Sequence, residues 1–372
     1  MNYSDKIIRS ATVENRADTN GVPDVQAFCA LYRALSARTL ITGFVYVSEN
    51  GRAMQPLQAG IVNDVQAAAW AKIRQALPDK QLIMQLAHVG RQTTRPGAVG
   101  ASNIRCTYCK APVRALKTAE VKQIVHDFAQ AALRAQKAGF DGVQIHAAHG
   151  YLIHQFLSPY TNNRTDEYKD RPLLLEEVLK AVRAVCPAPF LVWVKLSHAD
   201  DCGLMLSDTL ATVKRIETLC DGAEISYGTM EYPLNIIRGA IPIDTAFRVN
   251  PLFNKYPPFI QRLWKRFVFP FYKRRFKPFT ANYNLQAALE IKKHTALPVF
   301  VTGGIRTQRD INRILASGMD KVSLCRPFIK EPDLLTKLTG NWKSACVNCN
   351  LCTIYCDSSQ PVRCHLGEKN EV

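Results

Sequence analysis

The sequence predicts an α/β fold, a (β/α)8 TIM barrel with a basic insertion after strand 6 and a Cys-rich C-terminal tail. Short β-like runs alternate with amphipathic helical stretches, which is the pattern of a βα-repeat fold. Eight such pairs favour a closed parallel barrel over an open sheet. No run is followed by G-x-G-x-x-G, so a dinucleotide-binding sheet is unsupported.

The candidate strands are short runs rich in apolar residues. In chain order they span residues 7–12, 39–47, 81–87, 142–146, 190–196, 223–227, 299–302 and 321–325. The helical candidates between them are amphipathic. They span residues 24–37, 62–77, 118–138, 172–185, 207–219, 285–294 and 308–316. We therefore expect a barrel over residues 1–340 and a separate tail over residues 341–372.

Composition places the chain among large globular proteins. Its 372 residues are 47% hydrophobic, which suffices for one barrel with insertions. No stretch has the length of a membrane span and no signal-peptide pattern is visible, so a cytoplasmic protein is expected. In that compartment the 12 cysteines are expected to be reduced thiols, some of them metal ligands.

The formal charge of +17 is concentrated in one segment, residues 245–280, which we call the basic insertion. It contains no acidic residue and nine cations: Arg248, Lys255, Arg262, Lys265, Arg266, Lys273, Arg274, Arg275 and Lys277. Phe259, Leu263 and Phe267 fall on one face of a predicted helix. Three interpretations stay open. The segment is a lid that attracts an acidic or CoA-linked substrate, a docking site for anionic lipid or a partner protein, or a helix packed on the barrel.

The clearest chemical signal follows the fourth strand candidate. An apolar run ends in His146, His149 and Tyr151, at or just past the end of the strand. In a parallel barrel, side chains at that end face the active site. Two imidazoles and a phenol gathered there can bind a carbonyl oxygen and deliver a proton.

A second signal lies in the last two predicted strand–loop units. Gly303 and Gly304 follow an apolar run, and a glycine pair lets backbone amides approach a phosphate. Arg326 follows the next run and could clamp the same phosphate with its planar guanidinium. Barrels commonly bind phosphate at these two loops.

The histidine–tyrosine cluster, together with Gln-Phe-Leu-Ser-Pro at 155–159 and Asn-Arg-Thr-Asp-Glu-Tyr at 163–168, resembles the old yellow enzyme family, the FMN-dependent ene-reductases. The resemblance implies FMN as cofactor and NADH or NADPH as reductant. It further implies that His146 and His149 bind the carbonyl of an electron-poor alkene or enoyl acceptor and that Tyr151 supplies the proton.

By the same resemblance, four further residues contact the flavin ring. Thr12 matches the residue near the C4 carbonyl, Gly43 a small residue beneath the ring, and Gln85 the glutamine that binds the pyrimidine portion. Lys195 takes the position usually held by arginine, where a cation stabilises the anionic reduced flavin.

The tail has closely spaced cysteines. Cys346, Cys349, Cys352 and Cys364 resemble the [4Fe-4S] motif of the dienoyl-CoA reductases, with one residue fewer between the second and third. Thiolates at such spacing can hold an iron–sulfur cluster or zinc. Iron–sulfur, zinc and free thiols all stay open.

Two rival functions remain. One is an NADH oxidase or electron-transfer flavoprotein that uses an iron–sulfur cluster. The other is a tRNA-dihydrouridine synthase-like barrel, whose cysteine proton donor and helical RNA-binding domain contrast with Tyr151 and the cysteine tail here. No nucleic-acid partner is therefore expected.

Overall fold

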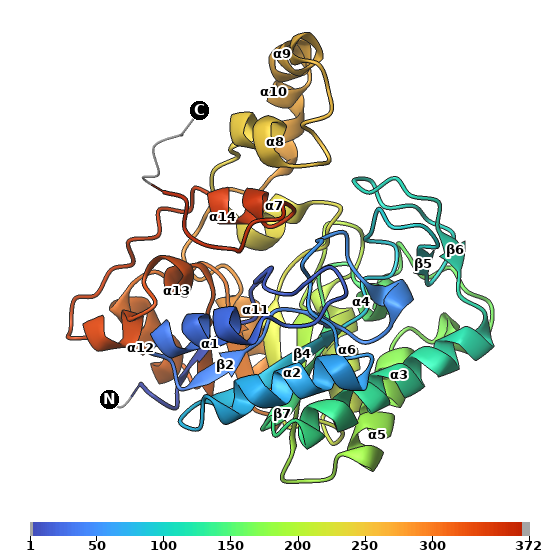
Figure 1. The fold of residues 1–372 in the computed structure, drawn as a ribbon, viewed down its shortest axis with the longest axis vertical. Helices are drawn as coiled ribbons and strands as arrows, with labels where there is room; N and C mark the ends of the chain where they lie inside the picture. The colour runs from blue at the N-terminus through green and yellow to red at the C-terminus, as the bar shows by residue number, and fades with distance from the viewer. Residues whose placement is uncertain (1–2, 367–372) are drawn as a thin grey trace.

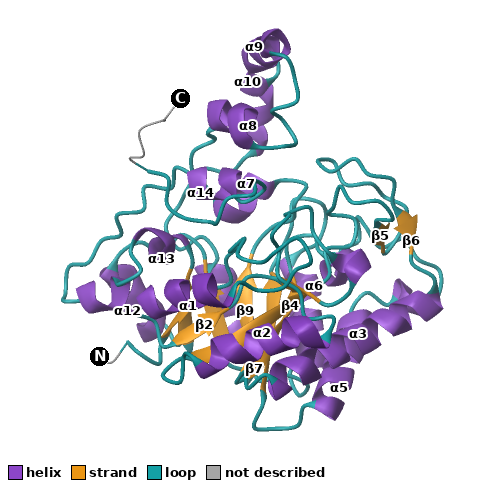
Figure 2. Cartoon of the chain, viewed as in Figure 1, coloured by secondary structure: helices purple, strands orange, loops and turns teal. Residues whose placement is uncertain are grey.

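Parallel strands close into a barrel at the centre of the computed structural model, which describes residues 3–366 (Figures 1 and 2). The barrel strands are β1 (Ile7–Arg9), β2 (Thr39–Ile41), β4 (Gln81–Ala87), β7 (Gly142–Ala147), β8 (Leu191–Ser197), β9 (Gly222–Ser226), β10 (Val299–Thr302) and β11 (Lys321–Leu324). They pair in the order β2-β1-β11-β10-β9-β8-β7-β4, and a β2–β4 pairing closes the ring. The predicted (β/α)8 barrel is confirmed.

Three shorter strands lie outside the ring. β3 (Val45–Tyr46) pairs with β4 beyond the end of β2. β5 (Val99–Gly100) and β6 (Arg114–Ala115) form a small parallel sheet in the loop that follows β4.

Helices surround the strands (Figure 2). The outer layer contains α1 (Val25–Ala34), α2 (Asp64–Gln75), α3 (Thr118–Lys137), α5 (Leu173–Val185), α6 (Leu206–Ile216), α11 (Leu285–Lys293), α12 (Gln308–Ala316) and α13 (Arg326–Lys330). Side-chain caps fix several helix starts: Asp24 accepts from the Ala27 amide, Asn63 from Gln66, and Thr307 from Asp310.

The loops at one end of the barrel carry the remaining helices. They are α4 (Leu152–Leu157), α7 (Pro233–Ile237), α8 (Ile243–Val249), α9 (Pro258–Phe267), α10 (Phe269–Tyr272) and α14 (Leu351–Tyr355). Short 3₁₀ turns occupy Glu49–Gly51, Glu167–Lys169, Lys273–Arg275 and Leu334–Lys337. The insertion follows β9, the sixth barrel strand, as predicted, and α8, α9 and α10 project from the barrel at the top of Figure 1.

The tail returns over the barrel mouth, where α14 packs against α8. Residues 367–372 of the predicted tail lie outside the described part of the chain. Within residues 3–366, no helix combines the length and the hydrophobicity that crossing a bilayer requires.

Candidate active site

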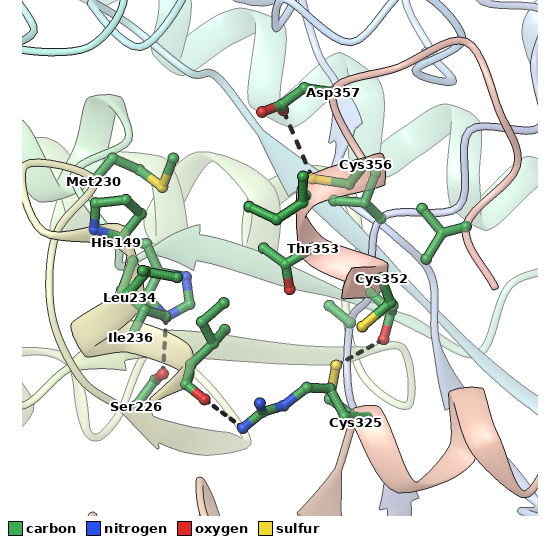
Figure 3. Close-up of a pocket in the computed structure, with 18 of the residues that line it drawn as sticks. His149, Ser226, Met230, Leu234, Ile236, Cys325, Cys352, Thr353, Cys356 and Asp357 are labelled. Carbon is green, nitrogen blue, oxygen red and sulfur yellow. Dashed lines mark hydrogen bonds between the residues drawn. The ribbon is translucent and has the colours of Figure 1, made fainter. Parts of the chain in front are cut away.

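A cavity of about 360 Å³ lies at the carboxyl ends of the barrel strands. Strand ends form its floor, loops and the base of the insertion form its walls, and the tail forms its roof. Figure 3 shows His149, Met230 and Leu234 on one side and Cys352, Thr353 and Cys356 of the tail on the other. The walls are mainly apolar, with Leu, Ile, Met, Phe and Pro side chains from residues 230–253 and beyond.

The predicted histidine–tyrosine cluster lines this cavity. The ring centroids of His146 and His149 are 5.1 Å apart, and those of His146 and Tyr151 are 4.7 Å apart. His146 lies on β7, whereas His149 and Tyr151 belong to the loop between β7 and α4. His149 has a φ of 63°, a left-handed conformation that turns the chain sharply just after the strand.

Burial sets the protonation of all three side chains. It holds the pKa of His146 and of His149 well below the ordinary value, with Lys195 also contributing at both. The two imidazoles are therefore neutral near pH 7. Burial also raises the pKa of Tyr151, so its phenol keeps its proton. No described residue accepts a hydrogen bond from the Tyr151 hydroxyl.

Local hydrogen bonds indicate which histidine nitrogens can donate. The Ala148 amide donates to His146 Nδ1 over 3.3 Å, so the neutral ring carries its proton on Nε2. His149 Nε2 pairs with Ser226 Oγ at 2.8 Å (Figure 3). His146 Nε2–H is thus a donor for an oxygen bound in the cavity.

Beneath the cavity, a chain of polar side chains crosses the barrel interior. Gln85 donates to Gln144, and Gln144 donates to Glu224, each over 2.8 Å. Ser10 donates to the other Glu224 oxygen over 2.5 Å. Lys195 Nζ donates to Ser10 Oγ over 3.0 Å and lies 3.3 Å from Glu224 Oε1.

The sequence reasoning missed Glu224 and Gln144. A fully buried acid within the apolar run of β9 was the signal that could have revealed Glu224. Its carboxylate compensates the charge of Lys195, whose position beside the flavin was predicted from the resemblance.

The predicted glycine pair also lines the cavity. Gly303 and Gly304 have φ values of 113° and 75°, and a Cβ on either would come within 2.6 Å of a neighbouring atom. Only glycine fits this turn without a shift of the chain. Tyr283 packs over both glycines and donates to the Ile236 carbonyl.

Three arginines surround that turn. Arg326 is 7% exposed and donates to the carbonyls of Ile237 and Arg238 and to Asn350 Oδ1. Arg306 also lines the cavity, and burial, followed by the charge of Arg326, lowers its pKa. Arg238 lies over the Tyr283 ring, 4.1 Å from its centroid. Sequence reasoning found only Arg326.

The two remaining predicted flavin contacts, Thr12 and Gly43, differ in whether they line the cavity. Thr12 lines the cavity, and its Oγ1 lies 3.1 Å from Cys325 Sγ. Gly43 does not line it. A Cβ at Gly43 would come within 2.7 Å of the Thr12 carbonyl, and the Gly43 amide donates to Glu14. Gly43 therefore permits close packing beside the cavity.

The tail forms the roof of the cavity. Asn348 accepts from Arg306, and Asn350 accepts from Arg326; both have positive φ. Burial raises the pKa of Asp357, which accepts from Gln55 over 2.6 Å and from Asn250 over 2.8 Å. Asp357 also lines the cavity and was missed, because no motif surrounds it in the sequence.

The structure does not bring the four predicted metal ligands together. Of these cysteines, only Cys352 lines the cavity. Throughout residues 3–366, no group of three or more His, Cys, Asp or Glu side chains is placed to hold a metal ion. None of the 12 cysteines forms a disulfide. The iron–sulfur or zinc site stays a prediction from spacing.

The cavity suits a planar anionic cofactor. Its volume is that of a typical ligand site. Gln92 Nε2 and Ser323 Oγ are buried, belong to residues of the cavity wall and have no hydrogen-bond partner among the described residues. Such groups are expected to bind a ligand. Arg306 and Arg326 supply positive charge beside the glycine turn, where a phosphate would lie.

Fold and site together define a barrel of the flavin-binding oxidoreductase class. The sequence model of the "NADH:flavin oxidoreductase / NADH oxidase family" matches residues 1–234, more than half of the chain. The protein therefore belongs to this family, the family of the old yellow enzymes. A model for "Histidine biosynthesis protein" matches a shorter stretch, residues 280–366.

Individual relatives agree with this assignment. An NADPH dehydrogenase of Listeria monocytogenes is 40% identical over 187 residues, which is 48% of this chain and 54% of the relative. A Bacillus subtilis NADPH dehydrogenase is 39% identical over 162 residues, 42% of this chain and 48% of the relative. The chain thus spans about half the length of these curated relatives. The solved structure of an old yellow enzyme homologue from Zymomonas mobilis aligns with a TM-score of 0.68 and 26% identity, covering 92% of this chain and 91% of that one.

Proposed function

We propose that this protein is an FMN-dependent NAD(P)H oxidoreductase that reduces an apolar, electron-poor alkene. The observation that carries the proposal is the position of Tyr151 beside His146 and His149 in a mainly apolar cavity at the carboxyl ends of the strands. Both substrates would use this cavity in turn.

Residues of the floor and the glycine turn would hold the cofactor. Gln85, Lys195 and Thr12 would lie near the ring, and Gly303, Gly304 and Arg326 near the phosphate. FMN, when bound, supplies hydride transfer from NADH or NADPH to the β-carbon of the acceptor. Arg306, which also lines the cavity, adds a second cation beside the phosphate.

The cluster on β7 and its loop would activate the acceptor. His146 Nε2–H is a neutral donor that can bind the acceptor's carbonyl oxygen and withdraw electron density from the double bond. His149 is held by Ser226 on β9 and faces the same space. Tyr151 Oη keeps its proton at neutral pH and can transfer it to the α-carbon as hydride reaches the β-carbon.

The walls favour an apolar acceptor over an acidic one. None of the nine cations of the basic insertion lines the cavity; its contributions include Leu252, Phe253 and Phe276. The predicted lid that attracts a CoA thioester therefore has no support from the cavity wall.

The decisive experiment is anaerobic reduction of the yellow protein by NADPH or NADH, followed by reoxidation. The panel would contain apolar cyclic enones, enoyl-CoA thioesters, nitroalkenes and oxygen. We expect the apolar enones to reoxidise the flavin fastest. Reoxidation by oxygen alone would overturn the ene-reductase proposal in favour of an NADH oxidase. Failure to bind FMN would overturn both.

A further inference from the structure

The outer end of the basic insertion exposes an unusual set of large apolar side chains. Helices α9 and α10 project beyond the barrel at the end of the molecule's longest axis (Figures 1 and 2). Six side chains there are between 39% and 66% exposed: Phe259, Ile260, Leu263, Phe267, Val268 and Phe271. Clustered exposure of this kind marks an interaction surface. We call these six residues the apolar tip.

The exposure does not come from a poorly packed segment, because the insertion has an inner side of its own. Trp264 lies 5.7 Å from Phe247 and 5.6 Å from Tyr272, between ring centroids. The Tyr272 hydroxyl in turn bonds to that of Tyr108, in the loop after β4. Trp264 therefore packs inward at the edge of the apolar face of α9, whereas the six side chains of the apolar tip stay exposed to solvent. The alternative in which the helix packs this apolar face on the barrel is wrong.

Basic residues border the apolar tip. Phe259, Leu263 and Phe267 recur at intervals of four and share one face of α9. Arg262 and Arg266 follow Phe259 and Leu263 by three positions, so they lie next to that face and are exposed. Long arginine side chains beside an apolar strip can reach phosphates while their stems stay in apolar surroundings.

Most of the charge on the insertion is uncompensated. Lys265 pairs with Asp244 and Lys277 with Asp201. The other cations make no ion pair with a described residue: Arg248, Lys255, Arg262, Arg266, Lys273, Arg274 and Arg275. These seven cations are all exposed, and no acidic residue occurs between 245 and 280. The surface is thus complementary to an extended anionic partner.

We propose that the apolar tip and its bordering cations dock the protein on an anionic lipid bilayer. A bilayer surface offers phosphates at the level of the arginines and acyl chains below them, which matches the two kinds of residue on α9. A nucleic acid would satisfy the charge but leave the six apolar side chains in water. A second copy of the chain would cover the apolar tip but would bring two strongly positive surfaces together.

The test is flotation with vesicles of phosphatidylcholine, with and without roughly one third phosphatidylglycerol. The intact protein is expected to float with the anionic vesicles and to be released by salt. R262Q/R266Q should weaken binding to the vesicles on the order of 20-fold, since the loss of each cation near an anionic surface is expected to weaken binding by a similar factor. L263Q/F267Q should weaken it on the order of tenfold or more.

Two matched variants control for charge and hydrophobicity. K169Q/R309Q removes two exposed cations elsewhere, and V65Q/M205Q removes two apolar side chains that are 66% and 61% exposed elsewhere. Both should bind as the parent does. Equal flotation of all variants, or no flotation on any vesicle, would overturn the proposal. So would self-association that L263Q/F267Q abolishes in the absence of lipid. Flavin content and melting temperature report whether each variant is folded.

Discussion

Lys195 and Glu224 face each other on adjacent strands of the barrel, with 3.3 Å between Nζ and Oε1 and with Ser10 donating to the carboxylate. The parallel register of β8 and β9 makes them direct partners. Both side chains are almost fully buried. The charge of Lys195, which would lie near the flavin ring, is thus partly neutralised, a property that the sequence position of Lys195 alone does not indicate.

A substitution at Glu224 tests the role of this pair. Glu224→Gln leaves the charge of Lys195 uncompensated, which stabilises the anionic reduced flavin. We expect the midpoint potential of the bound flavin to rise by a few tens of mV, since about 30 mV corresponds to 1.4 kcal/mol for two electrons. Potentiometric titration measures it, with the surface variant Glu290→Gln as control. An unchanged or lower potential in Glu224→Gln would show that Glu224 does not tune the site.

Tyr151→Phe tests the proton donor. Flavin reduction by NADPH should be unaffected, because that step needs no proton from the phenol. Reoxidation by an enone should slow by roughly 10²- to 10⁴-fold. Stopped-flow absorbance of the flavin separates the two half-reactions. Phe44→Leu, which alters the ring packed against Tyr151 at 5.5 Å between centroids, should have a much smaller effect. Unimpaired reoxidation would exclude Tyr151 as the donor.

Buried histidines predict the acid sensitivity of the fold. Burial lowers the pKa of His88 to about 3 and that of His198 to about 4, and it holds those of His146 and His149 well below the ordinary value of 6.5. The unfolded chain takes up protons near pH 6.5, whereas the folded chain does not. This stabilisation is therefore fully present above that pH and is lost as the pH falls toward 4.

Each such histidine should contribute a slope of about 1.4 kcal/mol per pH unit in the free energy of unfolding below pH 6. Urea unfolding between pH 7 and pH 5 measures it, above the range in which carboxylates dominate. His88→Gln should flatten the slope, and replacing the exposed His126 by Gln should not. A stability that is constant over this window would contradict the assignment.

Asn350 tests how the tail is attached. Its side chain accepts from Arg326 and donates to the Ala240 carbonyl over 2.9 Å, and its φ is 61°. Asn350→Ala loses these bonds and adds strain, whereas Asn350→Gly loses only the bonds. We expect the alanine variant to be less stable than the glycine variant by about 1–2 kcal/mol. Urea unfolding and protease cleavage within the tail would show this, and the reverse order would contradict it.

The barrel could be predicted from sequence because its signals are local. The predicted strands 81–87 and 299–302 coincide with β4 and β10, and the other boundaries differ by a few residues. The run 39–47 divides into β2 and β3 around Gly43, where the chain passes close to Thr12. Hydrophobic periodicity indicates which residues of a run alternate between buried and exposed sides. It does not indicate where the backbone of a distant segment comes close.

The histidine–tyrosine cluster was equally accessible, since its members lie within six residues of one another. Glu224, Arg306 and Asp357 were not, because their partners come from distant segments of the chain. Cysteine spacing predicted a shared metal site. Spacing alone does not fix the direction of side chains, so the metal site stays a prediction; Asn348 and Asn350, both with positive φ, lie between these cysteines. Iron and zinc analysis of the protein checks that prediction.

The roof over the cavity comes from residues 352–357, which are joined to Asn15, Gln55 and Asn250. During synthesis these residues leave the ribosome only after all eight barrel strands have been made. A nascent barrel is therefore open at its mouth, and a prosthetic group can enter before the final segment arrives. In that order of events, residues 352–357 close over a prosthetic group that is already in place.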